Sequence, residues 1–382
     1  MTRAGRFTPP ARQVVVYGRP AGDAVAQELA ELGAHRAVLV TNSSLAGPGR
    51  LADGLAAALG DRIVATVVGV GAHSPRADVL RIVEALRTSR ADAVLGLGGG
   101  SVCDAIKVAR LCLANGVNDI DGIGTLRAPA PQARPAEIPY IAVPTTLSAG
   151  EFTCYAGVTD TRIQRKELYY HASALPGVVV LDAAMTIATP PRLWFGTGMR
   201  AVDHAVETWC SVNVTPIVEA TSLHALRSLV PALRASQHDA HALAPRLDAL
   251  IGAWLSIQGV ATGVDLGASH GIGHMLGGTA GMPHGETSCV MLPHVLRFNA
   301  TVNGARQASL ATAMGHPGEN AAEIIQALVA SLGLPGRLRD AGVPRDLLPR
   351  IADESMRDMW IPTNPRPIRD VAEVLALLEA AW

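Results

Sequence analysis

Four histidines in the second half of the sequence have the types and spacing of an active site. His270 and His274 lie four residues apart in SHGIGH, so a helix would place both rings on one face. His284 follows a glycine-rich segment that could fold the chain back toward that face, and His204 lies earlier, in GMRAVDHAVETW. Helices that direct imidazoles into one cavity build metal and acid–base sites. A lone histidine is more often an ordinary buried polar residue, so the prediction depends on the group.

A second candidate site is a glycine-rich turn in LGLGGGSVCDAIK, residues 95–107. An apolar strand runs into Gly98, Gly99, Gly100 and Ser101, and a helix follows. Glycines let the backbone approach a pyrophosphate without Cβ clashes, and the N-terminus of the helix offers free N–H groups. The spacing is not GxGxxG. The alternative is a tight strand-to-helix turn in which Ser101 is an ordinary N-cap.

Polar residues near this turn extend the predicted nucleotide site. Asp104 and Lys107 fall in the first two turns of the following helix, and Lys107 is one of only two lysines in the chain. A second loop, VPTTLSAGEFT, leaves the next strand, where open α/β sheets bind ligands. Its hydroxyls belong to Thr145, Thr146 and Ser148. Lys107 could also be an ordinary surface charge, and this loop an ordinary polar turn.

The elements that must position these residues change character along the chain. In the first half, apolar runs alternate with helical patterns, which predicts a parallel sheet covered on both faces. The predicted strands are 13–18, 37–41, 63–69, 93–98, 140–144 and 178–182. The predicted helices between them are 23–33, 76–89 and 102–114, and 116–138 is expected to be a long surface loop.

From about Pro190 the strand pattern disappears and helical spacing takes over. The predicted helical segments are 197–212, 216–236, 241–264, 286–300, 320–333 and 368–381. The fold class is therefore an α/β nucleotide-binding domain, residues 1–188, followed by an all-α domain, residues 189–382. A cleft between the two domains is the expected ligand site.

Composition excludes several classes of protein. Apolar residues make up 49% and charged residues 17%, so the chain can bury large cores. A net charge of −1 and 4% aromatic residues argue against nucleic acid and membrane surfaces as partners. The five scattered cysteines suggest a reducing compartment. The N-terminal stretch shows no signal-peptide pattern, and no apolar run spans a membrane, so a cytoplasmic location is expected.

Taken together, these motifs resemble the iron-containing (group III) alcohol dehydrogenase family, whose nucleotide domain is similar to that of dehydroquinate synthase. The matching segments are GGGSVCDAIK, VPTTLSAGEFT, GMRAVDHAVE and HGIGHMLGGTAGMPHG, in family order and spacing, and the resemblance covers roughly residues 13–380. Within the family the sequence is most similar to maleylacetate reductases. The supporting segments are the His73-Ser-Pro stretch, MPHGETSCVMLPHVLRFNA and the C-terminal NPRPIRDVAEVLALLEAAW.

The resemblance implies roles for the motif residues. Gly98, Gly99, Gly100 and Ser101 would bind the pyrophosphate, Asp104 would border the nicotinamide, and Thr145, Thr146 and Ser148 would line the cofactor. His204, His270 and His284 fall on metal-ligand positions of the iron-dependent members, and His274 falls on a non-ligand histidine near the substrate. We also include Lys107 among the cofactor residues and His73 among the substrate residues. The family further implies a homodimer.

One departure bears on the metal. Metal-binding members carry Asp four residues before the first ligand histidine, where this chain has Arg200. An arginine would repel a divalent cation, and Asp203 is rotated by about 60° around the helix. Maleylacetate reductases also lack this Asp and are regarded as metal-independent, so bound Fe or Zn is doubtful. Arg200 suits a substrate carboxylate instead; alternatively, it pairs with Asp203 or a nearby Glu.

The predicted reaction is hydride transfer from NAD(P)H to an oxo or unsaturated carboxylic acid, as in aromatic-compound degradation. His274 is the candidate general acid, and His204, His270 and His284 would stabilise the developing oxyanion. Asn42 occupies the position of an NAD-selective Asp, so NAD(H) and NADP(H) should both be accepted. The alternatives are a metal-dependent alcohol dehydrogenase or aldehyde reductase, a lyase-type synthase, and a non-catalytic nucleotide-binding protein.

Overall fold

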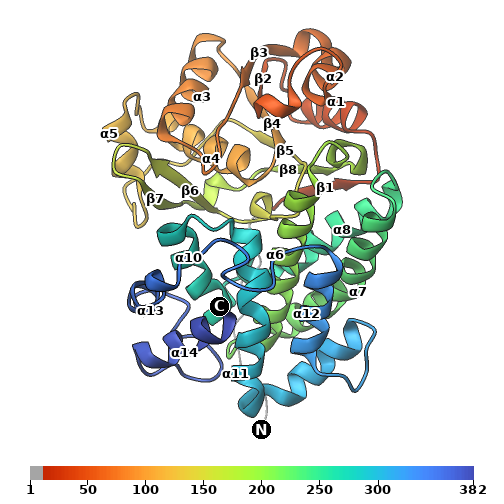
Figure 1. Cartoon of the computed structure of the whole chain (residues 1–382). Helices are drawn as coiled ribbons and strands as arrows, with labels where there is room; N and C mark the ends of the chain where they lie inside the picture. The colour runs from red at the N-terminus through yellow and green to blue at the C-terminus, as the bar shows by residue number, and fades with distance from the viewer. Residues whose placement is uncertain (1–11) are drawn as a thin grey trace. The chain divides into compact units, whose positions relative to one another are not determined.

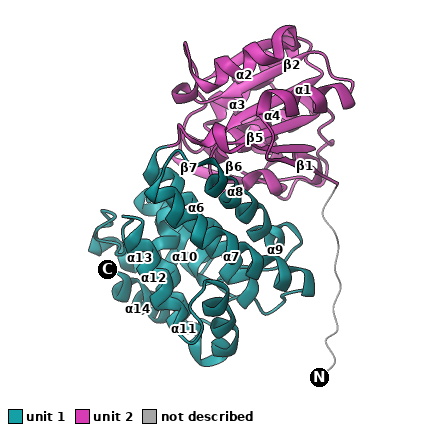
Figure 2. Cartoon of the chain, turned by 90° about the vertical axis from the view of Figure 1, so that its right-hand side faces the viewer, with its two compact units in different colours: residues 1–10, 190–382 teal, residues 11–189 magenta. Residues whose placement is uncertain are grey.

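The computed structural model describes residues 12–382. The N-terminal stretch considered for a targeting signal, and with it the start of the expected first domain, lies outside the described residues. The chain forms two compact units, coloured separately in Figure 2. The sheet unit ends at Thr189, and the helical unit runs from Pro190 to Trp382.

The sheet unit is built on a six-stranded sheet in the order β1-β8-β5-β4-β2-β3. Its strands are β1 (Val14–Tyr17), β2 (Ala37–Thr41), β3 (Ile63–Val68), β4 (Ala93–Gly98), β5 (Tyr140–Pro144) and β8 (Val178–Leu181). Every neighbouring pair is parallel. The near-continuous apolar strands therefore form the predicted doubly covered sheet, which confirms the fold class of the first half.

Helices cover both faces of this sheet (Figure 1). The helices α1 (Ala21–Glu31) and α2 (Leu51–Leu59) share one apolar cluster with Leu95 and Leu97 of β4. Gly96, between these leucines, faces the other side, where an added Cβ would lie 2.6 Å from Ile106 of α4 (Gly100–Ala114). The helix α3 (Arg76–Thr88) packs beside α4. The N-terminus of α4 thus lies at the carboxyl end of β4, where open sheets bind ligands.

An antiparallel hairpin that the sequence did not predict joins this unit. It consists of β6 (Tyr155–Asp160) and β7 (Arg165–Tyr170). The buried Arg76 forms ion pairs with Asp160, at 3.1 Å, and with Glu167, which fasten the hairpin to α3. The predicted loop 116–138 also contains a short helix, α5 (Ile120–Ile123).

The helical unit contains no strand in its described residues, as predicted. Its helices are α6 (Pro191–Cys210), α7 (Pro216–His238), α8 (Leu243–Ser256), α9 (Gln258–Ala261), α10 (Ala268–Ala280), α11 (His284–Ala313), α12 (Ala321–Ser331), α13 (Leu348–Ser355) and α14 (Val371–Ala381). The predicted segment 241–264 is thus two helices, and the segment 286–300 is part of a longer helix whose backbone departs from helical geometry at Asn303.

The core of the helical unit surrounds α10. Ile272 and Leu276 of this helix pack with Met291 and Val295 of α11 and with apolar residues of α13 and α14. The apolar residues of α10 therefore face the core, and its histidines lie on the opposite side of the helix, where the candidate site is. Within residues 12–382, no helix combines the length and hydropathy needed to cross a membrane.

Candidate active site

One face of α6 carries four charged or polar residues in the interior of the helical unit. Arg200, Asp203, His204 and Glu207 are spaced i, i+3, i+4 and i+7, so their side chains lie on the same side of the helix. Asp203, His204 and Glu207 are buried, and Arg200 is partly exposed. A buried charged face of this kind requires partners on a neighbouring element, and α10 supplies them.

Glu207 caps the N-terminus of α10. Its carboxylate accepts the backbone N–H groups of Gly267 at 3.0 Å, Ser269 at 2.9 Å and His270 at 3.3 Å. These N–H groups have no partner inside their own helix, and a carboxylate satisfies both their hydrogen bonds and the helix dipole. An added Cβ on Gly267 would lie 2.9 Å from Oε1 of Glu207, so glycine permits this close approach.

The same carboxylate orients the ring of His270. Nδ1 of His270 lies 2.8 Å from Oε2 of Glu207 and 3.5 Å from Oδ2 of Asp203, which accepts the hydroxyl of Ser269 at 2.7 Å. Because Glu207 already accepts backbone N–H groups on both oxygens, Nδ1 carries the hydrogen of a neutral imidazole. Nε2 of His270 is then an acceptor, and this buried atom has no hydrogen-bond partner among the described residues.

The ring of His204 stacks on that of His270, with centroids 4.9 Å apart and an interplanar angle of 24°. Nδ1 of His204 and Oδ1 of Asp203 are likewise buried and unpartnered within the described part of the chain. Since buried polar atoms are normally satisfied, several of them in one place indicate a site for a polar ligand or water.

Burial governs the charges in this cluster. It lowers the pKa of His204 and of His270 far below the usual value, and the neighbouring Arg200 adds to both shifts. Burial also raises the pKa of Glu207 to about 7, against the effect of its backbone donors, and raises that of Asp203 well above its usual value. Both imidazoles are therefore neutral near pH 7 and cannot act there as cationic acids.

Arg200 forms no ion pair or hydrogen bond with any described residue, Asp203 included. Burial lowers the pKa of its guanidinium, although Asp203 and Glu207 favour the charged form. The sequence-based alternative, in which Arg200 pairs with Asp203 or a nearby Glu, thus has no direct hydrogen bond or ion pair behind it among the described residues, although both acidic groups interact with Arg200 electrostatically. The guanidinium keeps its donors for another partner.

His274 and His284 stand on the same side of α10. Nδ1 of His274 lies 2.9 Å from Oδ2 of Asp358, and the rings of His274 and His284 meet edge-on with centroids 6.1 Å apart. His284 begins α11, and an added Cβ on Gly277 would lie 3.0 Å from its Cε1. The structure therefore brings the four predicted histidines together in the helical unit.

Close helix packing helps to place His284. An added Cβ on Gly285 would lie 2.4 Å from the backbone of Gly196 in α6, a distance that real atoms do not adopt. The absence of side chains at this crossing lets α6 and α11 approach until their backbones touch. The first turn of α11, which carries His284, is thereby held against α6.

In the sheet unit, the predicted nucleotide loops lie side by side. An added Cβ on Gly99 would come within 2.9 Å of Thr146, and one on Gly100 within 3.2 Å of Ser148. Thr145 is buried, and its backbone N–H donates to Gly98 at 3.0 Å. The bare backbone of the first loop and the hydroxyls of the second therefore form one surface at the N-terminus of α4.

Asn42 also reaches this surface, because an added Cβ on Gly98 would lie 2.8 Å from its Oδ1. The amide of Asn42 is fixed by donation from Nδ2 to the carbonyl of Val70 at 2.7 Å. No acidic side chain occupies this position at the end of β2.

Lys107 is fully buried, and its Nζ donates to the carbonyls of Gly150 at 2.6 Å and Tyr155 at 2.7 Å. This geometry supports a structural role that holds the second loop and β6 to α4, in place of the direct cofactor contact that the sequence suggested. Asp104 plays a similar part, because its Oδ2 accepts the N–H of Gly157 at 2.9 Å and burial raises its pKa.

His73, the second residue predicted to bind substrate, belongs to the sheet unit. Its backbone N–H donates to Oγ of Ser101 at 3.1 Å, and Ser74 donates to the carbonyl of Ser101 at 2.8 Å. Both His73 and Ser74 have positive φ angles, 60° and 53°, which only a well-tethered turn maintains. The structure thus groups His73 with the predicted phosphate-binding residues.

Comparison with known proteins agrees with this geometry. A model of iron-containing alcohol dehydrogenases matches residues 12–183, and one of the C-terminal part of the Fe-containing alcohol dehydrogenase family matches residues 195–382. The chain belongs to the iron-containing alcohol dehydrogenase family. As a member of this family it is an NAD(P)-dependent oxidoreductase, which confirms the enzyme class predicted from the motifs.

Individual relatives span nearly the whole chain. A dehydrogenase of Gibberella moniliformis, FUM7, is 35% identical over 92% of this chain and 92% of its own length. A maleylacetate reductase of Pseudomonas aeruginosa is 28% identical over 96% of this chain and 95% of its own. The crystal structure of maleylacetate reductase from Agrobacterium tumefaciens superimposes with a TM-score of 0.84 at 28% identity, covering 100% of this chain and 99% of that one.

Sequence reasoning missed two residues of the site. Glu207 could have been found, because it continues the helical spacing of Arg200 and His204. Asp358 had no local signal, since it lies 84 positions from His274 in an irregular segment after α13.

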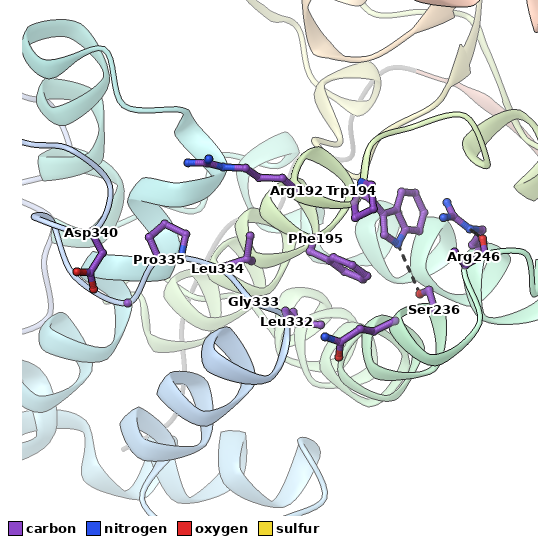
Figure 3. A pocket seen from close by; sticks show the side chains of 14 residues that line it. Arg192, Trp194, Phe195, Ser236, Arg246, Leu332, Gly333, Leu334, Pro335 and Asp340 are labelled. Carbon is purple, nitrogen blue, oxygen red and sulfur yellow. Dashed lines mark hydrogen bonds between the residues drawn. The ribbon is translucent and has the colours of Figure 1, made fainter.

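A further cavity lies elsewhere in the helical unit (Figure 3). It encloses about 640 Å³ and is lined by parts of α6, α7 and α8 and by the segment after α12. Trp194 forms one wall, with the guanidinium of Arg246 stacked 4.5 Å from the ring centroid. The site histidines are not among the lining residues, so this cavity is separate from the cluster described above.

Proposed function

We propose that this chain transfers a hydride from NADH or NADPH to an oxo or unsaturated carboxylic acid, as maleylacetate reductases do, and that it uses no metal. The observation that carries the proposal is the guanidinium of Arg200, which neighbours His204 and, among residues 12–382, forms no hydrogen bond or close ion pair with a carboxylate, although Asp203 and Glu207 are near enough to favour its charged form. A guanidinium binds a carboxylate through two parallel charge-assisted hydrogen bonds. The similarity to two maleylacetate reductases supports the same substrate class.

The family name implies a divalent metal, but the residues present do not fit one. Arg200 stands at the position of a ligand Asp, and its charge already contributes to the low pKa values of His204 and His270. The same field opposes a dication between these imidazoles. Both oxygens of Glu207 already accept N–H groups, which leaves Oδ1 of Asp203 as the one unpartnered buried carboxylate oxygen among the described residues of the cluster. No step of the proposed reaction therefore passes through a metal.

The sheet unit fits a dinucleotide. The backbone at Gly99 and Gly100 leaves no room for side chains, and Ser101 stands at the N-terminus of α4, whose free N–H groups suit a diphosphate. Thr146 and Ser148 would line the bound cofactor. Asn42 carries no charge that would repel a 2′-phosphate, so we propose that both NADH and NADPH bind. When bound, the reduced nicotinamide supplies the hydride.

In the helical unit, Arg200 binds the substrate carboxylate and His274 donates the proton. His204 is neutral and offers a hydrogen bond to the reacting oxygen. For His270 the predicted role is revised: its Nδ1–H bonds to Glu207, so Nε2 accepts a hydrogen bond from a hydroxyl rather than stabilising an oxyanion.

Replacement of Arg200 tests the substrate class. In Arg200→Ala, KM for an oxo acid should rise about 10- to 100-fold, the value of a charge-assisted pair. KM for a neutral aldehyde should change little. Arg227→Ala, on the exposed side of α7, is the matched control. Equal effects on both substrates would refute the proposal, and so would NADH binding without turnover across a panel of oxo acids and aldehydes.

The second candidate is a metal-dependent alcohol dehydrogenase. One observation favours it: ligand atoms of Asp203, Glu207 and His270 lie within 4.8 Å of one another. Elemental analysis of the purified enzyme, with activity measured before and after chelation, separates the two. Near-stoichiometric iron or zinc that is required for turnover would show that the enzyme is a metal-dependent alcohol dehydrogenase.

A further inference from the structure

The ring of His274 has a carboxylate partner that no sequence motif predicts. Oδ2 of Asp358 lies 2.9 Å from Nδ1 of His274. The other oxygen, Oδ1, accepts the backbone N–H of Trp360 at 2.9 Å, and the Asp358 side chain is only 8% exposed. The carboxylate is therefore held from both sides, and its orientation relative to the imidazole is fixed.

A glycine in α10 lets the carboxylate of Asp358 approach the helix closely. Gly271 lies one turn before His274, and an added Cβ there would lie 3.2 Å from Oδ1 of Asp358 and 3.1 Å from Ile361. Such contacts are tighter than nine in ten real Cβ contacts, so a larger residue would require Asp358 or Ile361 to shift by a few tenths of an ångström. The pairing of Asp358 with His274 thus depends on a close approach that Gly271 allows.

The contact selects one tautomer of the imidazole. An ionised carboxylate only accepts hydrogen bonds, so Nδ1 of His274 carries the hydrogen that bonds to Oδ2. Nε2 is then the nitrogen that exchanges a proton with a substrate. We propose that Asp358 is a positioning residue for His274, which fixes the ring so that Nε2 serves the reduction; this inference rests on the function proposed above.

Two histidines of α10 therefore have carboxylate partners in different surroundings. His270 with Glu207 is sealed in the interior, whereas the side chain of His274 is 32% exposed. Other titratable groups near His274 are His284, edge-on at 6.1 Å, and His270 one turn away. Of the two carboxylate-linked imidazoles, only His274 can recover a proton directly from solvent.

The proton balance follows from this arrangement. The nicotinamide cofactor provides the two electrons as a hydride to carbon. The Nε2–H bond of the imidazolium breaks as a new bond to the substrate oxygen or carbon forms, and the Nδ1–H bond to Asp358 remains intact. Solvent then returns a proton to Nε2.

Asp358→Asn gives a sharp test, because the structure dictates how the amide will sit. The N–H of Trp360 requires an acceptor, so the carbonyl of Asn takes the position of Oδ1 and its NH₂ group faces Nδ1 of His274. Nδ1 must then accept, and the ring hydrogen moves to Nε2. In ¹⁵N-histidine spectra of the full-length protein, the His274 signals, assigned by their loss in His274→Gln, should change from the Nδ1–H to the Nε2–H pattern.

Kinetics supply the second measurement. Asp358→Asn should lower kcat for the oxo acid about 10- to 100-fold with little change in the KM for NADH, the size of effect seen when an orienting carboxylate is lost. Asp358→Glu, which keeps the charge, should recover part of the loss. The control is Asp353→Asn on the exposed side of α13, where the carboxylate pairs with Arg357 instead; it should match the wild type.

The outcomes separate this inference from the proposed function. A tautomer change with unaltered kcat, or an unchanged tautomer, would overturn the positioning role while leaving the reductase activity intact. If the wild type reduces no oxo acid, the proposed function fails, and the spectra still report on the bond between Asp358 and His274. A tautomer change together with a loss of kcat supports the inference.

Discussion

Oε2 of Glu207 lies 2.8 Å from Nδ1 of His270, although the two residues are 63 positions apart. The same carboxylate accepts three backbone N–H groups from the start of α10. One side chain therefore performs two tasks, since it caps the helix that carries the histidines and sets the tautomer of the first of them. The end of the helix and the chemistry of the site therefore depend on the same carboxylate.

Glu207→Gln should therefore impair both stability and activity. The amide has one acceptor oxygen in place of two, and its NH₂ group would face buried N–H donors that then lack a partner. Each unsatisfied donor costs about 1 to 3 kcal/mol, so we expect the free energy of unfolding to fall by about 3 kcal/mol, measured in urea. Because His270 also loses its fixed tautomer, kcat should fall at least about tenfold.

The control for this variant is Glu323→Gln, on the exposed side of α12 near its N-terminus. A solvent-exposed substitution of this kind changes stability by less than about 0.5 kcal/mol. If both variants unfold at the same urea concentration as the wild type, Glu207 does not cap α10 in solution.

The strands of the sheet could be predicted because each is a short, uninterrupted apolar run, and three of the six were predicted with the observed bounds. The hairpin of β6 and β7 escaped prediction because neither strand, YAGVTD or RKELYY, contains an uninterrupted apolar run, and its tip is polar and charged. Its position is fixed by Arg76, whose partners Asp160 and Glu167 are distant in sequence. Local pattern carries no information about such a contact.

In the candidate site, too, local features could be predicted from the sequence and long-range contacts could not. The four histidines were found from their spacing, and the turn at Gly98–Ser101 from its composition. The orientation of each ring was not predictable, because it is set by Glu207 and Asp358, which come from other elements. Lys107 shows how little a single charged residue predicts: its type suggested a cofactor contact, whereas its side chain is fully buried and donates to two carbonyl groups.

A substitution at Gly99 tests the nucleotide surface. In Gly99→Ala the new Cβ would lie 2.9 Å from Cγ2 of Thr146, so one of the two loops must move. The dissociation constant of NADH, measured by titration calorimetry, should rise at least about tenfold, because the diphosphate needs close approach to the backbone. Thermal unfolding should shift only modestly, since the change lies at the edge of the sheet.

Gly54→Ala provides the matched control in the same unit. Gly54 lies within α2, and no atom lies within 4 Å of an added Cβ. Alanine is the better helix former by about 1 kcal/mol, so this variant should be slightly more stable and bind NADH normally. Normal NADH affinity in Gly99→Ala as well would show that the cofactor does not use this turn.

Glu151 makes stability depend on pH near neutrality. This carboxyl lies in the loop with Thr146 and Ser148, and burial raises its pKa from 4.5 to about 7, although Lys107 opposes the shift. The folded state therefore holds the proton more tightly than the unfolded chain does. The stabilising contribution is complete below about pH 4.5 and is lost as the pH rises through about 7.

Glu151→Gln removes this titration while keeping the size of the side chain. Relative to the variant, the wild type should lose about 2 to 3 kcal/mol of unfolding free energy between pH 5 and pH 8. Urea unfolding of both proteins at these two pH values measures the difference directly. A difference that stays constant over this range would mean that Glu151 keeps one charge state throughout, and it would contradict the prediction.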